Sequence, residues 1–160
     1  MLQTTNIKLQ SQGQSIAPSL EIQRLHLFVG KWKTEGETHA RADAPAVKVA
    51  FMDTYEWMPG KFFLVHRADG QIGNEQLNTL EFIGYDPSSQ TYTCHSFDSR
   101  GNSDLFQATL RDHTWTIEGK SSRFTGVFTS TGSTLTGKWE QSSDGVNWLP
   151  WMDVKLTKIS

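Results

Sequence analysis

The 160-residue sequence contains a single cysteine, Cys94, and therefore cannot form an internal disulfide. Clusters of basic residues are missing too, because 15 Lys and Arg residues are scattered among 17 Asp and Glu residues, for a formal net charge of -2. Nucleic acids and anionic membranes require a concentrated positive surface, so we expect neither as a partner. No run is long and apolar enough to cross a bilayer, and residues 1–18 lack the apolar core of a signal peptide. These absences favour a protein of the reducing cytoplasm.

Local motifs for several common chemistries are also absent. None of the five histidines is spaced with a second ligand as in a metal-binding helix or knuckle, although ligands from separate strands could still converge in a folded barrel. The serines lack the Gly-x-Ser-x-Gly elbow of serine hydrolases, and no glycine-rich loop opens a helix as a phosphate cradle. A lone cysteine is more often a small buried apolar group than a reactive thiolate. We therefore expect no metal site, no cofactor and no covalent nucleophile.

The chain is expected to form one domain preceded by a tail. Its length suits a single domain with a sizeable core, and residues 1–18 are rich in Gln, Ser and Thr, which predicts a flexible polar tail. Residues 19–160 make up the predicted domain. Apolar residues recur at helical spacing between Ile22 and Phe28, behind the potential N-cap residue Ser19, so the domain is expected to begin with one short helix.

After Gly30 the apolar residues alternate with polar ones at a period of two, which is typical of strands with one wet and one dry face. Turn residues separate similar segments and give about ten predicted strands, one beginning near Gly30 and the others at residues 47–57, 61–67, 77–85, 91–98, 104–111, 114–119, 123–129, 134–141 and 148–157. A closed sheet buries one apolar face and leaves no exposed edge. We predict an all-β fold, a closed antiparallel up-and-down barrel of about ten strands, with Pro150 at a bulge or an edge.

The start of the first predicted strand carries a recognisable signature. Gly30-Lys-Trp32 follows the short helix, and this element resembles the opening motif of calycins, the superfamily of lipocalins and fatty-acid-binding proteins. In that superfamily the tryptophan plugs the closed end of the barrel and a basic residue packs on it. The resemblance implies the same place for Trp32, with Lys158 or Lys155 where lipocalins have an arginine.

A broader resemblance covers the chain from about Leu25 to Thr157 and is to an uncharacterised bacterial family of calycin-like barrels, a domain of unknown function. The stretches that carry it are Glu56-Trp-Met-Pro-Gly60, Gly84-Tyr-Asp86, Ser96-Phe-Asp98 with Gly101-Asn102, Arg123-Phe-Thr-Gly126, Gly137-Lys-Trp-Glu140, and Asp144-Gly145 with Trp148. These motifs are mostly turns and barrel ends, so the resemblance implies a fold and no particular activity. Nitrobindins, a related calycin group, hold heme with a histidine near the C-terminus. Because the last histidine here is His113, we expect no heme bound in that way.

Three titratable residues, Asp53, His66 and Glu81, share the parity of apolar neighbours on their predicted strands. His66 is either a core or barrel-mouth histidine with its hydrogen bonds satisfied, or a residue that contacts or converts a ligand. Glu81 is another candidate for an inward carboxylate, although solvent exposure is its expected position. The three are the candidate catalytic residues, because an acid and a base from this set could act on a small molecule.

The charges at these positions require partners. An ionised carboxylate buried alone is very costly, so Asp53 is expected to pair with Arg67, with Arg123 or with a tyrosine hydroxyl, or else to titrate at a raised pH. If Arg123 turns inward, its guanidinium fork could clamp a carboxylate of a ligand.

The aromatic content suggests what fills the barrel. The sequence has six Trp, nine Phe and three Tyr residues, and most of them are expected to be core. A barrel of about ten strands is nevertheless too wide for side chains to fill completely, which leaves room for a small ligand. The candidate ligand-binding residues, which could line that interior, are Trp32, Phe51, Tyr55, Phe62, His66, Trp115, Arg123 and Trp139.

Three functions remain open from the sequence. The leading hypothesis is a protein that binds a small hydrophobic or amphipathic molecule inside the barrel. The second is an isomerase, cyclase or hydrolase of a small organic substrate that uses the inward Asp, His and Glu residues. The third is a structural domain that forms a homodimer through an exposed aromatic patch around Trp148, Pro150 and Trp151.

Overall fold

The computed structural model describes residues 16–160, so the predicted polar tail over residues 1–18 falls almost entirely outside the described residues. The expected short helix is present as α1 (Leu20–Arg24), followed by the 3₁₀ turn η1 (Leu25–Phe28). The Ser19 side chain caps the helix by accepting a hydrogen bond from the backbone N–H of Ile22. Neither helical segment of the described chain has the length and apolar run needed to cross a bilayer.

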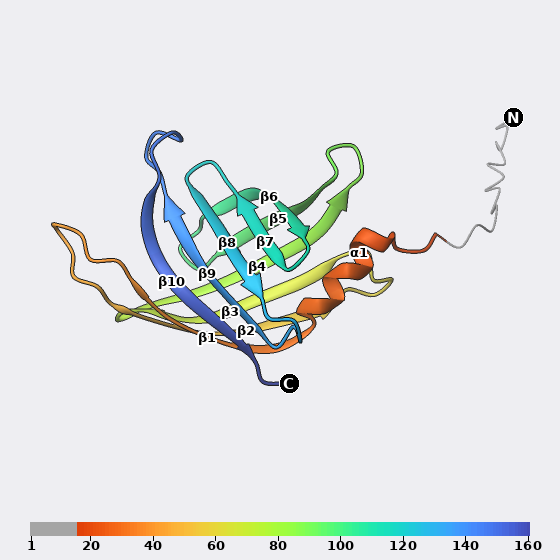
Figure 1. The fold of residues 1–160 in the computed structure, drawn as a ribbon, viewed down its shortest axis with the longest axis horizontal. Helices are drawn as coiled ribbons and strands as arrows, with labels where there is room; N and C mark the ends of the chain where they lie inside the picture. Colours follow the sequence, from red (N-terminus) through yellow and green to blue (C-terminus); the bar gives the residue numbers. More distant parts are fainter. Residues whose placement is uncertain (1–15) are drawn as a thin grey trace, which may run out of the picture.

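Ten strands in residues 16–160 form one closed antiparallel barrel, as predicted (Figure 1). Each strand pairs with its neighbours in the chain, and β10 closes the sheet by pairing with β1. The strands are β1 (Gly30–Thr38), β2 (Lys48–Trp57), β3 (Leu64–Ile72), β4 (Glu75–Asp86), β5 (Thr91–Asp98), β6 (Ser103–Arg111), β7 (Thr114–Glu118), β8 (Ser122–Phe128), β9 (Thr134–Gln141) and β10 (Leu149–Lys158).

The alternation of the sequence sets the inner face of the sheet. On β7, for example, Trp115 and Ile117 are buried between less buried neighbours, and on β10 Met152 is the first of three buried residues at alternate positions. The pairing of β10 with β9 shifts register between Pro150 and Met152, which is the irregularity expected where proline cannot donate to the ladder.

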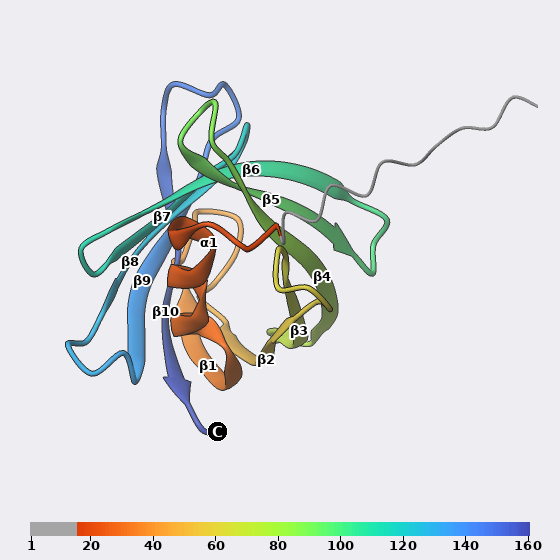
Figure 2. The ribbon, with the colours of Figure 1, turned by 90° about the vertical axis from the view of Figure 1, so that its right-hand side faces the viewer.

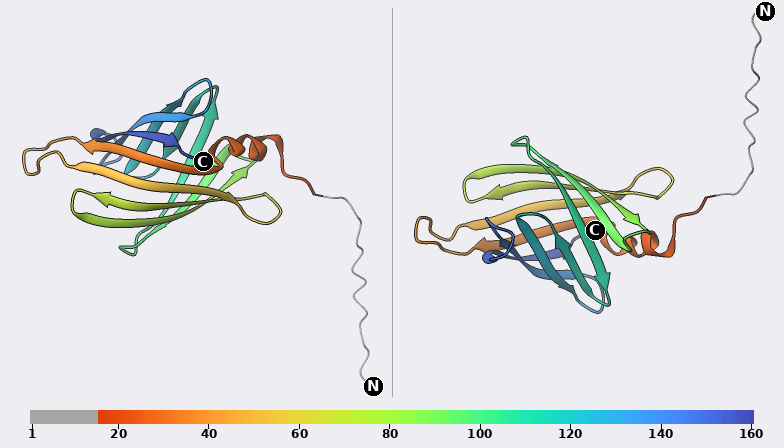
Figure 3. Two further views of the ribbon diagram at one scale, coloured as in Figure 1. Left: turned by 90° about the horizontal axis from the view of Figure 1, so that it is seen from below. Right: turned by 90° about the horizontal axis from the view of Figure 1, so that it is seen from above.

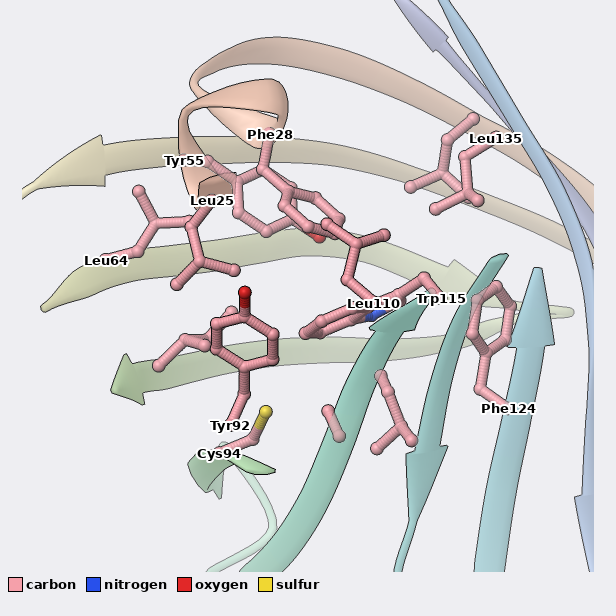
Figure 4. Close-up of a cluster of buried hydrophobic side chains, with 14 of the residues drawn as sticks. Leu25, Phe28, Tyr55, Leu64, Tyr92, Cys94, Leu110, Trp115, Phe124 and Leu135 are labelled. Carbon is pink, nitrogen blue, oxygen red and sulfur yellow. The ribbon is translucent and has the colours of Figure 1, made fainter. Parts of the chain in front are cut away.

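The helical segment lies across one end of the barrel (Figure 2). Leu25 and Phe28 are buried there, and the Phe28 ring centroid lies 5.2 Å from that of Tyr55 and 5.0 Å from that of Trp115 (Figure 4). The hairpin between β1 and β2 projects at the opposite end (Figure 3). One end of the barrel is therefore closed by packed rings, and the loops after β1, β3, β5, β7 and β9 surround the other.

Trp32 plugs the closed end in the way the calycin resemblance implies. Its side chain is buried, and its Nε1 donates a hydrogen bond of 2.7 Å to the Phe28 carbonyl. Of the two lysines considered for this position, Lys158 packs on the tryptophan: its Nζ lies 5.0 Å from the centroid of the Trp32 ring and donates to the Leu27 carbonyl. These contacts join the helical segment to β1 and β10, the first and last strands of the barrel.

Two longer-range hydrogen bonds fix the helix to the far wall. The Arg24 guanidinium donates to the Leu110 carbonyl on β6 at 2.9 Å, and the Tyr92 hydroxyl on β5 donates to the Glu21 carbonyl at 2.7 Å. The helix is therefore held by strands on opposite sides of the barrel, which keeps this end shut.

Candidate functional site

The interior of the barrel holds a partly open cavity of about 280 Å³, just below the range of roughly 300–1,000 Å³ that ligand pockets occupy. Its two walls differ in chemistry. Strands β6 to β10 line it with apolar side chains apart from Ser122, whereas strands β1 to β5 also contribute hydroxyl, imidazole and carboxyl groups. The aromatic residues of the apolar wall are Phe106, Trp115, Phe124, Trp139 and Trp151.

The register of the sheet brings the polar residues together. Tyr55 on β2 is paired with His66 on β3, His66 with Glu81 on β4, and Glu81 with Ser96 on β5. Asp53 lies two residues before Tyr55 and so shares its inward face. The polar wall therefore consists of one row of four paired residues across β2 to β5, together with Asp53, which lies diagonal to that row.

Asp53, His66 and Glu81 form a hydrogen-bonded cluster, called here the imidazole cluster. His66 Nε2 lies 2.7 Å from Asp53 Oδ1, and His66 Nδ1 lies 3.2 Å from Glu81 Oε1. The second oxygen of Asp53 accepts a hydrogen bond of 2.5 Å from the Thr34 hydroxyl. The structure therefore brings all three candidate catalytic residues into contact, with Asp53 and Glu81 buried and His66 mostly buried between them.

Two expectations about the carboxylates are wrong. Asp53 pairs with His66 and Thr34 rather than with an arginine or a tyrosine hydroxyl, because His66 stands on the adjacent strand and on the same inner face. Glu81 is 9% exposed rather than solvated, because its strand pairs it directly with His66. Arg67, one residue along the strand from His66, is exposed and points away from the cluster.

His66 is held as a cation by its surroundings. An ionised carboxylate only accepts hydrogen bonds, so both ring nitrogens of His66 must donate, which requires the protonated imidazole. Burial acts to lower the pKa of His66, but the hydrogen bonds to Asp53 and Glu81 outweigh it and raise the pKa from 6.5 to about 9. The Tyr55 ring stacks on the imidazole with centroids 4.0 Å apart and planes 4° apart, which fixes its orientation.

Some polar groups of this wall are left available to a ligand. Among residues 16–160, the Tyr55 hydroxyl and the second carboxylate oxygen of Glu81 have no hydrogen-bond partner, and both residues line the cavity. No fully buried polar side-chain atom of the described chain lacks a partner, so these two atoms face the open space of the cavity. Burial, together with the charges of Asp53 and Glu81, raises the pKa of Tyr55 well above its ordinary value, and its hydroxyl is therefore a neutral donor.

Arg123 does not enter the cavity, so its prediction as a ligand-binding residue is wrong, and the carboxylate clamp that an inward Arg123 could form is absent. Phe124 takes the inward position on β8, and the alternation of the strand turns Arg123 outward. There its Nε donates to Glu140 Oε1 at 3.0 Å, and its guanidinium lies 4.4 Å from the centroid of the Trp148 ring. The hydrogen bond from Arg123 lowers the pKa of Glu140.

Two predicted aromatic lining residues are also placed elsewhere. Phe62 belongs to the turn before β3, which begins at Leu64 and not at Lys61, so its ring does not line the cavity. Trp32 lies in the plug of the closed end and is not part of the lining. The other predicted residues, Phe51, Tyr55, His66, Trp115 and Trp139, all line the cavity.

The aromatic patch expected around Trp148, Pro150 and Trp151 does not form. Trp151 lines the cavity with its ring centroid 6.3 Å from that of Trp139, and Trp148 lies under the Arg123 guanidinium. Trp151 was not predicted as a lining residue, because the register shift after Pro150 changes which residues of β10 point inward.

Thr34 and Ser96 were missed as well. Thr34 shares the parity of Trp32 on β1, so its inward position was readable from the alternation. Ser96 lines the cavity opposite Glu81, and its inward position was readable too, because it shares the parity of the buried residues Tyr92 and Cys94 on β5.

Metal and thiol chemistry have no support in the described part of the chain. Within residues 16–160, no group of three or more His, Cys, Asp or Glu side chains is arranged to hold a metal ion. Cys94 is buried, and this burial raises the pKa of its thiol well above the ordinary value, which disfavours the reactive thiolate.

Comparisons with known proteins identify a family and a fold. Residues 17–148 match the model of a family described as "Protein of unknown function (DUF1579)". The structure is similar to that of Rv2717c from M. tuberculosis, with a TM-score of 0.64 and 9% identity over 89% of this chain and 99% of that one. It is also similar to the S-type phycobiliprotein lyase CPES from Guillardia theta, with a TM-score of 0.62 and 12% identity over 89% and 99% of the two chains. No curated protein matches the sequence.

Proposed function

This chain belongs to the DUF1579 family, and from the geometry of its barrel we propose that it binds a small amphipathic molecule in the cavity. The observation that carries the proposal is a cavity of about 280 Å³ with one apolar aromatic wall and one polar wall. Small-molecule sites are mostly apolar concavities with a few placed polar groups, and this arrangement meets that description. The similar fold of a phycobiliprotein lyase is consistent with a small-molecule ligand.

The two walls would contact different parts of the ligand. Rings such as Trp115 and Trp139 offer apolar surface whose burial by a ligand is favourable by about 25 cal/mol per Å². The Tyr55 hydroxyl and the free Glu81 oxygen offer hydrogen bonds that orient the polar end of the ligand. The single cysteine, Cys94, also leads us to propose a location in the cytoplasm.

Filling the cavity is expected to weaken this binding. Ala68 lines the cavity on β3, whereas Ala50 is exposed on the outer face of β2, so the two alanines provide a matched pair. We expect naphthalene-1-methanol to bind the native protein, and Ala68→Phe to weaken this binding by about tenfold or more because the new ring takes the space of the ligand. Isothermal titration calorimetry measures the affinities.

Ala50→Phe adds the same ring outside the barrel and is expected to bind the probe as the native protein does. Circular dichroism checks that both variants fold. Equal loss of affinity in the two variants, or no binding to the native protein up to the solubility limit of the probe, contradicts the proposal. Native mass spectrometry of the freshly purified protein then identifies any molecule retained in the barrel.

A second candidate function is acid–base catalysis on the bound molecule, and the imidazole cluster favours it. Both nitrogens of His66 are engaged, so His66 positions Glu81 and does not itself exchange a proton with a substrate. The free Glu81 oxygen is then the base, and the neutral Tyr55 hydroxyl is the acid. This pairing suits an isomerase, cyclase or hydrolase of a small substrate.

Turnover distinguishes catalysis from binding. If the protein is an enzyme, a molecule retained after purification is expected to be converted on incubation, and Glu81→Gln is expected to slow that conversion by about 10²-fold or more because the base is lost. Mass spectrometry and chromatography of the extracted molecule follow the change. Recovery of a single unchanged compound, or conversion at an equal rate by Glu81→Gln, leaves binding alone as the function.

A further inference from the structure

We infer that the molecule bound in the cavity carries a protonated amine, which Glu81 holds at the polar wall. This inference rests on the proposed binding function and narrows its ligand class. Three features carry it: the balance of charge around the imidazole cluster, one carboxylate oxygen without a partner, and the apolar wall opposite.

The polar wall contains more negative than positive charge. Asp53 and Glu81 share the single imidazolium of His66, so one negative charge is uncompensated. No lysine or arginine of the described chain lines the cavity to offset it. An unpaired charge away from water is costly, and a ligand cation would remove that cost.

The uncompensated charge is located at Glu81. Both oxygens of Asp53 already accept hydrogen bonds, one from His66 and the other from Thr34. Glu81 accepts a hydrogen bond through only one oxygen in the described structure, and its side chain is about nine-tenths buried against the cavity. A donor placed in the cavity therefore meets the second Glu81 oxygen as an acceptor that the protein does not itself use.

The surrounding groups favour an ammonium over other polar groups. Ser96 lies directly opposite Glu81 on β5 and lines the cavity, and its hydroxyl makes no hydrogen bond within residues 16–160, so it provides a second acceptor. A ligand carboxylate would add a second uncompensated negative charge. A ligand hydroxyl would donate a hydrogen bond to the carboxylate but leave its charge in place, whereas an ammonium would both donate the bond and neutralise the charge.

The rest of the ligand is defined by the opposite wall. The cavity of about 280 Å³ faces the protonated group with rings and aliphatic side chains from β6 to β10. The class of ligand is therefore a small primary or secondary amine with a compact aromatic or aliphatic body.

Three probes that share one ring system and differ in one polar group test this inference. Naphthalene-1-methylamine, naphthalene-1-methanol and naphthalene-1-carboxylate are titrated into the native protein at neutral pH and moderate salt, with calorimetry as the readout. We expect the amine to bind about tenfold more tightly than the alcohol and about a hundredfold more tightly than the carboxylate. Equal affinities, or a preference for the carboxylate, would overturn the inference while leaving the proposed binding function intact.

A substitution that removes the charge of Glu81 tests whether this residue causes the preference for the amine. Glu81→Gln is expected to reduce the ratio of amine to alcohol affinity from about tenfold to about threefold or less, because the amide keeps an acceptor and removes the charge. Glu140→Gln removes a carboxylate that pairs with Arg123 outside the cavity, and it is expected to keep the native ratio. A native ratio in Glu81→Gln overturns the assignment to Glu81. If none of the three probes binds the native protein, the proposed function fails, and the inference fails with it.

Discussion

The free energy of unfolding is expected to fall by about 3 kcal/mol as the pH rises from 6.5, the ordinary pKa of histidine, to above about 9, the pKa of His66 in the fold. Because the folded pKa is raised, the folded state binds the His66 proton more tightly than the unfolded state does. This stabilisation is complete below the unfolded pKa and is lost as the pH rises through the folded one. Urea unfolding followed by tryptophan fluorescence at a series of pH values measures it.

A variant without the imidazole tests the assignment. His66→Phe is expected to lose the pH dependence in this window and to be about 3–5 kcal/mol less stable at neutral pH, because it leaves the Asp53 and Glu81 carboxylates buried without their cation. His39 forms an exposed pair with Asp153, so His39→Gln provides a matched control that should retain the native slope. A native slope in His66→Phe, or a flat profile in the native protein, would show that the cluster does not bind the proton as described.

A third variant separates charge from packing in the same cluster. If Asp53→Leu and Glu81→Leu are added to His66→Phe, no buried carboxylate remains, and part of the lost stability should return because well-packed apolar groups often replace buried ion pairs without penalty. No recovery would mean that His66→Phe destabilises the barrel by misfit of the ring and not by stranded charge.

The closed barrel could be predicted because the alternation of apolar and polar residues within each strand shows which side chains face inward. Alternation within a strand depends only on local sequence, and it placed Tyr55, His66 and Trp115 on the inner face correctly. The turns between strands are marked by Gly, Pro, Asp and Ser, and the short helix by its cap, Ser19. These signals are local, so a single sequence is sufficient to find them.

The partners inside the barrel could not be predicted in the same way. Which residue of β3 faces Asp53 depends on the register between two strands, and no local pattern states that register. Alternation alone therefore left arginines and a tyrosine hydroxyl as the predicted partners of Asp53 and did not single out His66, although Asp53 and His66 share the inner face. Glu81 was misplaced for the same reason, since its burial follows from its pairing with His66.

Strand ends were a second source of error. Phe62 has the parity of His66, but the chain reaches β3 only after a turn in which Gly60 and Lys61 adopt positive φ angles of 90° and 60°. Side chains alternate between faces only within a strand, so the shared parity of Phe62 and His66 does not place Phe62 on the inner face. For Arg123 the pattern was readable, since the large apolar residues Phe124 and Phe128 mark the inner face of β8 and turn the arginine outward.

Truncation of the plug, Trp32→Ala, is expected to lower the free energy of unfolding by about 3–5 kcal/mol, because it leaves a large void beneath the helical segment and removes the donor to the Phe28 carbonyl. Trp32→Phe keeps most of the ring and is expected to cost less, with the unpaired carbonyl as the main loss. Trp148→Ala removes a half-buried tryptophan at the opposite end and is the control for ring loss alone, with a cost of about 1 kcal/mol.

Because Trp32 does not line the cavity, Trp32→Phe should bind naphthalene-1-methanol with native affinity. Equal destabilisation by Trp32→Ala and Trp148→Ala in urea unfolding would show that the closed end does not depend on this plug, and lost binding in Trp32→Phe would show that the plug also shapes the cavity.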